Sequence, residues 1–187
     1  GGGFTAINVS NPASPDIVAS VDTQGNATGI AVSGSRAYVA DGSAGLLVFD
    51  ISRESDPDVV GTYTTNDKAR DVAVSGSHAY VADGDAGLQI LNVSNPQSPV
   101  PAGTVSVGGF VEAVSVAGPH AYVVDSDGGL SIVATSDPAQ ASLTGSIAAG
   151  ISLVDVAVAG PYAYLVDSSS SLQVIDVSDP AVPRIAG

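Results

Sequence analysis

A phrase that recurs four times at a 42-residue interval constrains the fold of this chain more than any other feature. Each copy contains a tyrosine followed three residues later by an aspartate, and flanking glycines and leucines keep the same step. The pairs are Tyr38 and Asp41, Tyr80 and Asp83, Tyr122 and Asp125, and Tyr164 and Asp167. A period of about 40 to 50 residues built from short strands and turns is typical of propeller blades. The interval therefore predicts an array of blades.

One copy of the repeat divides into four predicted strands. Apolar and polar side chains alternate within short segments, and glycine-rich or proline-containing segments separate them. Gly76 and Ser77 have the composition of a tight hairpin turn. In the second full copy the strands are predicted at residues 71–75, 78–83, 88–93 and 102–107. With 22 glycines and 11 prolines and few long charged side chains, the chain is predicted to be all-β, a β-propeller of four-stranded antiparallel blades.

The 187 residues contain about four and a half repeats and are predicted to form a single β-propeller domain or a fragment of one. We divide the chain into the second half of a blade, three full repeats and an incomplete last repeat, at residues 1–24, 25–66, 67–108, 109–150 and 151–187. Because both ends interrupt a repeat, we expect part of a larger ring. The alternative is a closed four-bladed ring, in which the strand near residues 16–21 completes the last sheet.

The first strand of each repeat places a small residue between two β-branched ones, as in Val72-Ala73-Val74. Branched side chains suit the packing between blades, and the small residue permits close approach near the axis. A phenylalanine at Ala73 is therefore expected to overpack the site.

The third strands, with the Ala-Tyr-Val-Ala-Asp-Gly that precedes them, resemble the LVIVD repeat. They read Leu-Leu-Val-Phe-Asp at 46–50, Leu-Gln-Ile-Leu-Asn at 88–92 and Leu-Gln-Val-Ile-Asp at 172–176. The resemblance covers nearly the whole chain and implies a β-propeller, usually in secreted or surface proteins of bacteria and archaea. The third copy departs from the pattern at Ala134, and the fourth has Ser171 in place of the turn glycine.

Composition excludes several classes of function. Nineteen acidic against five basic residues give a net charge of −14, which repels phosphate backbones, so nucleic acid is not expected as a partner. There is no cysteine for a disulfide or a thiolate site, and no apolar segment for membrane insertion. No serine-triad or phosphate-loop motif is present. We expect no cofactor and no enzymatic activity.

The four repeated aspartates Asp41, Asp83, Asp125 and Asp167 are interpreted as structural turn residues. Each carboxylate is expected to accept backbone N–H groups of the turn that follows it. Calcium is the alternative, because Asp83 and Asp85 place two carboxylates around a flexible turn. His78 and His120 lie one repeat apart, but Arg36 and Tyr162 hold the same position. We therefore predict no metal site.

The loops between the last strand of one blade and the first strand of the next differ most between copies. A rigid scaffold usually presents its binding residues on such loops. Lys68, Arg70 and Asp71 from one loop, with Phe110 and Glu112 from the next, form the predicted binding set. Ordinary variation of solvated loops is the alternative interpretation.

The sequence favours a secreted or cell-surface propeller that acts as a non-catalytic structural or protein-interaction module. Its partners would be other proteins or further parts of the same surface assembly. One alternative is a subunit of an extracellular filament joined by sheet-edge pairing. Another is a propeller enzyme, or a small-ligand or calcium binder, in which Asp71, Glu112 and Asp155 converge at the channel mouth. Three sequons, at Asn8, Asn26 and Asn92, match the glycosylation pattern.

Overall fold

The computed structural model describes residues 2–150 and 152–187, and nearly all of its regular structure is antiparallel β-sheet. The first sheet has two strands and each of the next four sheets has four. They are β1 (Gly3–Asn8) and β2 (Asp16–Asp22); β3 (Gly29–Ser33), β4 (Arg36–Ala40), β5 (Leu46–Asp50) and β6 (Asp58–Tyr63); β7 (Asp71–Ser75), β8 (His78–Ala82), β9 (Leu88–Asn92) and β10 (Val100–Val105); β11 (Val111–Ala117), β12 (His120–Asp125), β13 (Gly129–Ala134) and β14 (Ser142–Ala148); β15 (Leu153–Ala159), β16 (Tyr162–Asp167), β17 (Leu172–Asp176) and β18 (Arg184–Ile185). A short 3₁₀ helix, η1 (Pro138–Gln140), precedes β14.

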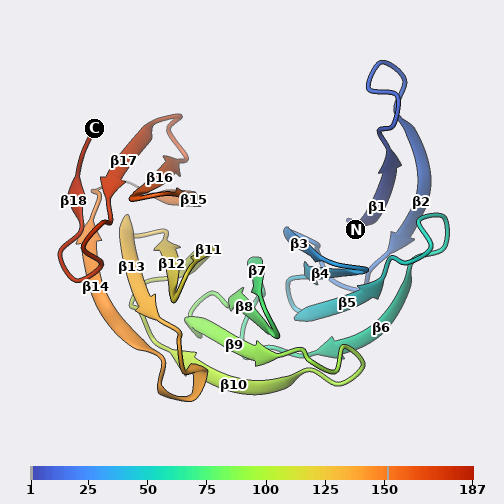
Figure 1. The fold of residues 1–187 in the computed structure, drawn as a ribbon, viewed down its shortest axis with the longest axis horizontal. Helices are drawn as coiled ribbons and strands as arrows, with labels where there is room; N and C mark the ends of the chain where they lie inside the picture. The colour runs from blue at the N-terminus through green and yellow to red at the C-terminus, as the bar shows by residue number, and fades with distance from the viewer. Residues whose placement is uncertain (1, 151) are drawn as a thin grey trace.

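The sheets are the blades of a propeller, which confirms the predicted fold. Strands β3, β7, β11 and β15 lie at the inside of an arc, and β2, β6, β10 and β14 form its outer rim (Figure 1). The arc is open, with the β1–β2 pair facing the last blade across a gap (Figure 1). The four-bladed ring is therefore wrong, because β2 pairs with β1 and not with the last sheet.

Strand boundaries follow the turn chemistry. In the turn from β7 to β8, Gly76 has φ +57° and Ser75 pairs with His78, so the turn has two residues, with glycine first. The predicted fourth strand starts two residues too late. Strand β10 begins at Val100 and includes Pro101, which an outer strand tolerates because one side of its backbone needs no partner.

The core lies between blades. One buried cluster joins Tyr38, Leu46 and Val48 of the second blade to Val81 and Leu91 of the third. Equivalent clusters join the third blade to the fourth and the fourth to the fifth. The recurring tyrosine and the alternating apolar positions of the repeat thus hold successive blades together.

The close approach between blades also requires glycine on the outer strands, a point that sequence reasoning missed. A Cβ atom added at Gly61, Gly103 or Gly145 would collide with a backbone carbonyl of the next blade's loop, at Pro96, Pro138 and Pro180 respectively. The sequence contains a signal for this close approach, because these glycines and prolines recur with the 42-residue step.

Candidate functional site

The predicted binding residues lie where the chain passes from one blade to the next, at the inner side of the arc. Lys68 and Arg70 precede β7, and Asp71 is its first residue. Phe110 precedes β11, and Glu112 lies at a bulge in that strand, between the paired residues Val111 and Ala113. The bulge leaves Glu112 without a directly opposite residue and turns it away from the regular ladder.

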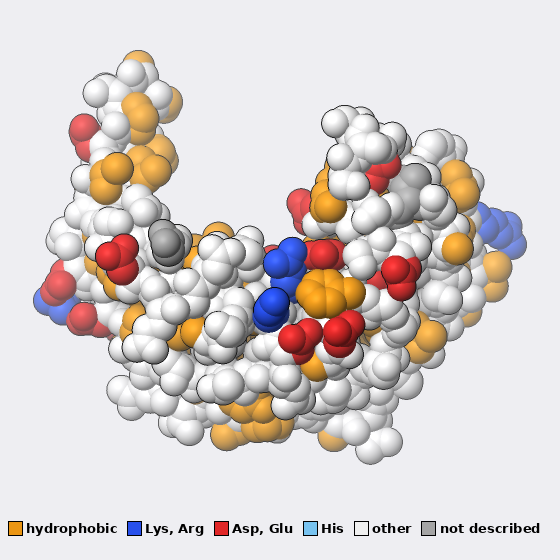
Figure 2. Space-filling model, turned by 180° about the vertical axis from the view of Figure 1, so that it is seen from behind, with side chains coloured by type: hydrophobic (Ala, Val, Ile, Leu, Met, Phe, Trp, Pro, Cys, Tyr) orange, Lys and Arg blue, Asp and Glu red, His pale blue; other side chains and the backbone are white. Residues whose placement is uncertain are grey.

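Arg70 and Glu112 form the centre of the set. The Nε and Nη2 groups of Arg70 donate to Oε2 of Glu112 at 2.9 and 2.7 Å. The guanidinium carbon also lies 5.8 Å from the centroid of the Phe110 ring, within range of a cation–π contact. Basic side chains next to a hydrophobic one, with acidic side chains around them, are visible at the middle of the inner edge (Figure 2).

Two hollows flank Arg70. The larger, about 570 Å³, is lined by Asp71, Glu112 and Asp155 among others. The other, about 400 Å³, has Lys68 and Arg70 on one side and Asn26 and Gly42 on the other. Lys68 is exposed and does not join the Arg70–Glu112 pair. The structure thus brings Arg70, Phe110 and Glu112 together and leaves Lys68 at the edge.

Burial raises the pKa of the Asp71 carboxyl, and the nearby Asp155 charge adds to this effect. The N–H of Val114 donates to Oδ2 of Asp71 at 3.0 Å and partly offsets the increase. Asp71, Glu112 and Asp155 line one hollow, yet over residues 2–150 and 152–187 no group of three or more His, Cys, Asp or Glu side chains is placed to hold a metal ion.

The four repeated aspartates are buried and cap turns in two different ways. Asp125 and Asp167 accept from the turn that follows them, as the sequence predicted. The donors are the N–H groups of Asp127 and Gly129 at 3.0 and 2.9 Å, and of Ser169 and Ser171 at 2.9 and 2.7 Å. The Ser171 bond is the main reason that the pKa of Asp167 is lowered.

Asp41 and Asp83 differ from that prediction, because they hold the loop that leads into their own blade. Asp41 accepts from the Thr23 hydroxyl at 2.6 Å and the Gly25 N–H at 2.9 Å. Asp83 accepts from the N–H groups of Asn66 and Asp67 at 2.9 and 3.2 Å, and burial raises its pKa.

The residue after each aspartate explains the difference. Gly42 and Gly84 have φ of +56° and +53°, which glycine adopts at no steric cost. Their backbones then bridge to Ala69 and Val111 at the start of the next blade. Ser126 and Ser168 replace these glycines in the later copies, and there the carboxylate caps its own turn. This glycine-to-serine change is the signal that sequence reasoning overlooked.

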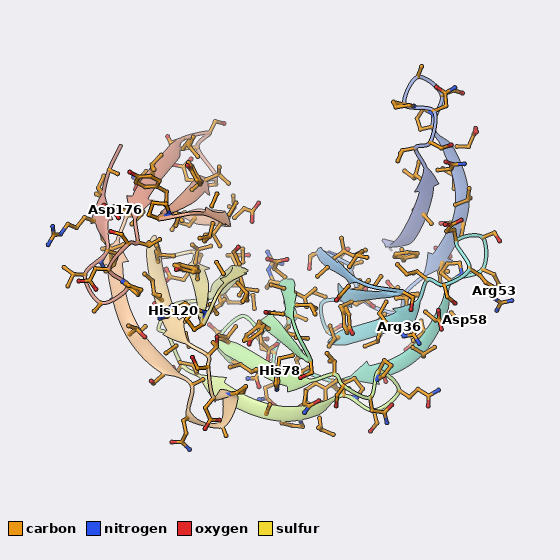
Figure 3. The ribbon with its side chains drawn as sticks, viewed as in Figure 1. Arg36, Arg53, Asp58, His78, His120 and Asp176 are labelled. Atoms are coloured by element: carbon orange, nitrogen blue, oxygen red, sulfur yellow. The ribbon has the colours of Figure 1, made fainter. Side chains whose placement is uncertain are left out.

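His78 and His120 begin the second strands of neighbouring blades and lie apart (Figure 3). His120 contacts Tyr122 edge-on, with ring centroids 6.5 Å apart.

Among the sequons, Asn8 and Asn92 each accept the N–H of the serine two residues later, at 2.9 Å, so both have a role in a turn. Asn26 is exposed and lines the smaller hollow. In the described part of the chain, no helix is long and apolar enough to span a membrane.

Comparison with known proteins identifies the repeat. The family model described as the LVIVD repeat matches residues 1–23, 24–65, 67–107, 108–149 and 152–187. No curated protein matches the chain. A functionally unknown protein from Desulfotomaculum acetoxidans DSM 771 superposes with a TM-score of 0.80 at 14% identity, over 97% of this chain and 61% of that one.

Two computationally designed proteins have similar folds. Ika4 has a TM-score of 0.67 at 11% identity, over 83% of this chain and 94% of its own. Ika8 has a TM-score of 0.66 at 9% identity, over 84% of this chain and 48% of its own. The chain thus spans about three fifths of the Desulfotomaculum protein and about half of Ika8. At these identities, the similarity shows the fold alone.

Proposed function

The chain belongs to the LVIVD-repeat family, and on that premise we propose that it is a secreted or cell-surface propeller module that binds another protein and has no catalytic role. The arrangement of Arg70 between Phe110 and Glu112 carries the proposal. Arginine and aromatic side chains are enriched among the residues that dominate protein–protein binding energy. Here the two contacts of the guanidinium hold it in one orientation at the edge of a hollow.

Preorganisation supports this choice of surface. An arginine that is fixed before binding loses less side-chain entropy on forming a complex than a free one does. Arg70, Phe110 and Glu112 are each only partly buried, so they can contact a partner without unfolding the loops. Over a chain with net charge −14, Lys68 lies outside the Arg70–Glu112 pair and supplies a positive charge for an acidic group of the partner.

Photo-crosslinking tests the binding surface. With a photoreactive phenylalanine analogue at Phe110, we expect an adduct with a specific protein on intact cells of the source organism. Arg70→Ala should abolish the adduct. The matched control places the analogue at Ser77, which is exposed in the β7–β8 turn at the other end of the sheet. No adduct from Phe110, or the same adduct from both positions, would refute the proposal.

The proposed location of the protein, outside the cell or at its surface, has a separate test. A protein outside the cell or at its surface is degraded when protease is added to intact cells, whereas an intracellular marker survives. Survival of the protein together with the marker would contradict the proposed location without affecting the crosslinking result.

A second candidate function is small-ligand binding in the larger hollow. It rests on the placement of Asp71, Glu112 and Asp155 around about 570 Å³, a volume within the range of ligand sites. Because acidic side chains favour a positively charged ligand, calorimetric titration with a small organic diamine checks it, with Asp71→Asn and Asp155→Asn as variants. Binding heat that is unchanged in both variants would contradict a ligand site in this hollow.

A further inference from the structure

The turn that follows the second strand of a blade has one backbone N–H group that binds a carboxylate in three of the four-stranded blades. The donors are Asp85, Asp127 and Ser169, and their acceptors are Asp67, Asp125 and Asp167, at 2.9, 3.0 and 2.9 Å respectively. Ser43 holds the same repeat position in the second blade. Over residues 2–150 and 152–187, the Ser43 N–H donates to no acceptor of the protein. The repeat therefore shows where a carboxylate fits, and it leaves that place open once.

Two departures from the other copies keep this place open. Asp41 does not bind the N–H of its own turn, because it accepts from the preceding loop, including the Gly25 N–H at 2.9 Å. Asp83 accepts in the same way from the Asp67 N–H, and there the Asp67 side chain supplies the carboxylate for the turn. Gly25 holds the position of Asp67 in the repeat, so the second blade has no side chain that could do this.

The charge around the open N–H group favours an anion. Ser43 and Lys68 both line the hollow of about 400 Å³. Lys68 takes the repeat position of Phe110, whose ring lies with the Asp67 carboxylate beside Gly84 in the third blade. Lys68 is exposed and forms no ion pair in the described part of the chain, and no described residue that lines this hollow is acidic. A carboxylate in the hollow thus meets an N–H donor and an ammonium group.

The rest of the lining indicates the class of acid. No aliphatic or aromatic side chain is among the described residues that line the hollow, and its wall includes the exposed side chains of Gln24, Asn26 and Ser43. Amide and hydroxyl groups both donate and accept hydrogen bonds, so they match the hydroxyl groups of a ligand. The volume is within the range of small-ligand sites. A sugar acid carries both a carboxylate and several hydroxyl groups.

We propose that this hollow binds a sugar acid, whose carboxylate accepts the Ser43 N–H and pairs with the ammonium group of Lys68. Its hydroxyl groups contact the side chains of Gln24 and Asn26. The acid is either free or a residue of an acidic polysaccharide, since both present the same chemistry. The site does not require the protein partner that we propose at Phe110, so the two proposals can fail separately.

Titration of the protein with galacturonate, followed by NMR of the backbone amides, tests the site. The Ser43 amide proton should move downfield and saturate, because a charge-assisted hydrogen bond forms there. Galactose, the neutral counterpart, should leave this proton unchanged. Acetate supplies a carboxylate without hydroxyl groups and should bind more weakly than galacturonate does.

Two variants locate the contact. Lys68→Gln should weaken galacturonate binding by on the order of tenfold, because it removes the charge from one of the two carboxylate donors. Ser43→Asp should abolish binding, since it places a negative charge in the hollow, and the turn accommodates aspartate because Asp85 holds the same position. The matched control is Ser77→Asp, which makes the same change of charge in the exposed β7–β8 turn and should bind normally.

The source of the acid is distinguished with trigalacturonate. Tighter binding than that of the single sugar supports a polysaccharide, and equal binding supports a free acid. The proposal is overturned if neither probe gives a saturable shift at Ser43, if acetate binds as tightly as galacturonate, or if Ser43→Asp and Ser77→Asp weaken binding equally. Galacturonate binding without a crosslink at Phe110 would refute the protein partner alone.

Discussion

Arg70 and Glu112 occupy consecutive repeat positions 42 residues apart in sequence, yet their side chains meet at 2.7 Å between Nη2 and Oε2. Thr28 and Val154 hold the corresponding positions elsewhere in the arc. The ion pair is therefore a departure from the repeat that exists only between the third and fourth blades. It joins two loops at the surface that we propose as a binding site.

A double-mutant cycle of Arg70→Ala and Glu112→Ala should give a coupling free energy of roughly 0.5 to 1 kcal/mol, because two N–H groups of Arg70 donate to one oxygen of Glu112 but the pair is partly exposed. The coupling should decrease with added salt. Chemical denaturation of the four proteins measures it. The control pair, Arg53 and Asp58, lies at the rim (Figure 3), 3.8 Å apart with both side chains largely exposed, and should give no measurable coupling. Equal coupling free energies in both pairs would contradict the conclusion that the Arg70–Glu112 contact is the stronger one.

Asp71→Asn should stabilise the protein at neutral pH. Burial raises the pKa of Asp71 above the ordinary value of 3.8. The protonated carboxyl therefore favours the folded state below that value, and this contribution to stability is lost as the pH rises through the raised pKa of the folded protein. Asparagine removes the buried charge and keeps an oxygen that accepts from the Val114 N–H. Thermal unfolding at pH 7 and at pH 3 should show a gain that disappears in acid.

Asp167→Asn is the matched control for Asp71→Asn and should behave in the opposite way. The Ser171 N–H lowers the pKa of Asp167, so its ionised form contributes stability above the ordinary value of 3.8, and that stability is lost as pH falls through the lowered pKa. The variant should be less stable than the natural protein at pH 7 and equal to it in acid. Two variants that shift in the same direction would refute the environments described for both carboxyls.

Periodicity was enough to predict the fold, because each blade uses local antiparallel pairing and a repeated apolar pattern. The Gly76 turn, the alternating strands and the inter-blade tyrosines all follow from residues that recur at a fixed step. Closure of the array could not be predicted in the same way. The four-bladed alternative failed because curvature depends on side-chain packing between blades, which a one-dimensional pattern does not specify.

The candidate site was harder to predict, since it consists of departures from the repeat. Sequence reasoning placed Arg70, Phe110 and Glu112 on neighbouring loops but gave no reason for a guanidinium to lie against both other side chains. The bulge at Glu112 determines that geometry. Similarly, the repeated aspartate has two roles, because the residue that follows it differs between copies. Gly84 after Asp83 and Ser126 after Asp125 favour different backbone turns.

Gly84→Ala should destabilise the protein by roughly 2 to 4 kcal/mol, more than a glycine substitution at a similar φ elsewhere. Gly84 has φ +53°, and a Cβ atom there would lie 2.9 Å from Cε2 of Phe110 and would collide with the Asp67 carboxylate. The control, Gly76→Ala, has φ +57° and open space around the new atom. It should cost only the backbone strain, about 1 to 2 kcal/mol.

Urea denaturation compares the two glycine variants. The Gly84→Ala variant should also weaken the proposed crosslinking at Phe110, because the new Cβ atom displaces the ring from its present position. Equal losses of stability at the two glycines would show that the Phe110 ring does not pack against this turn.

Ala73→Phe should cost on the order of 1 to 3 kcal/mol, whereas Ala157→Phe should change stability by less than about 0.5 kcal/mol. The two alanines hold the same position in the repeat. Ala73 packs against the buried cluster between the third and fourth blades, while Ala157 is exposed on the last blade. Chemical denaturation of both variants measures the difference. Equal destabilisation by both substitutions would contradict the difference in packing between Ala73 and Ala157.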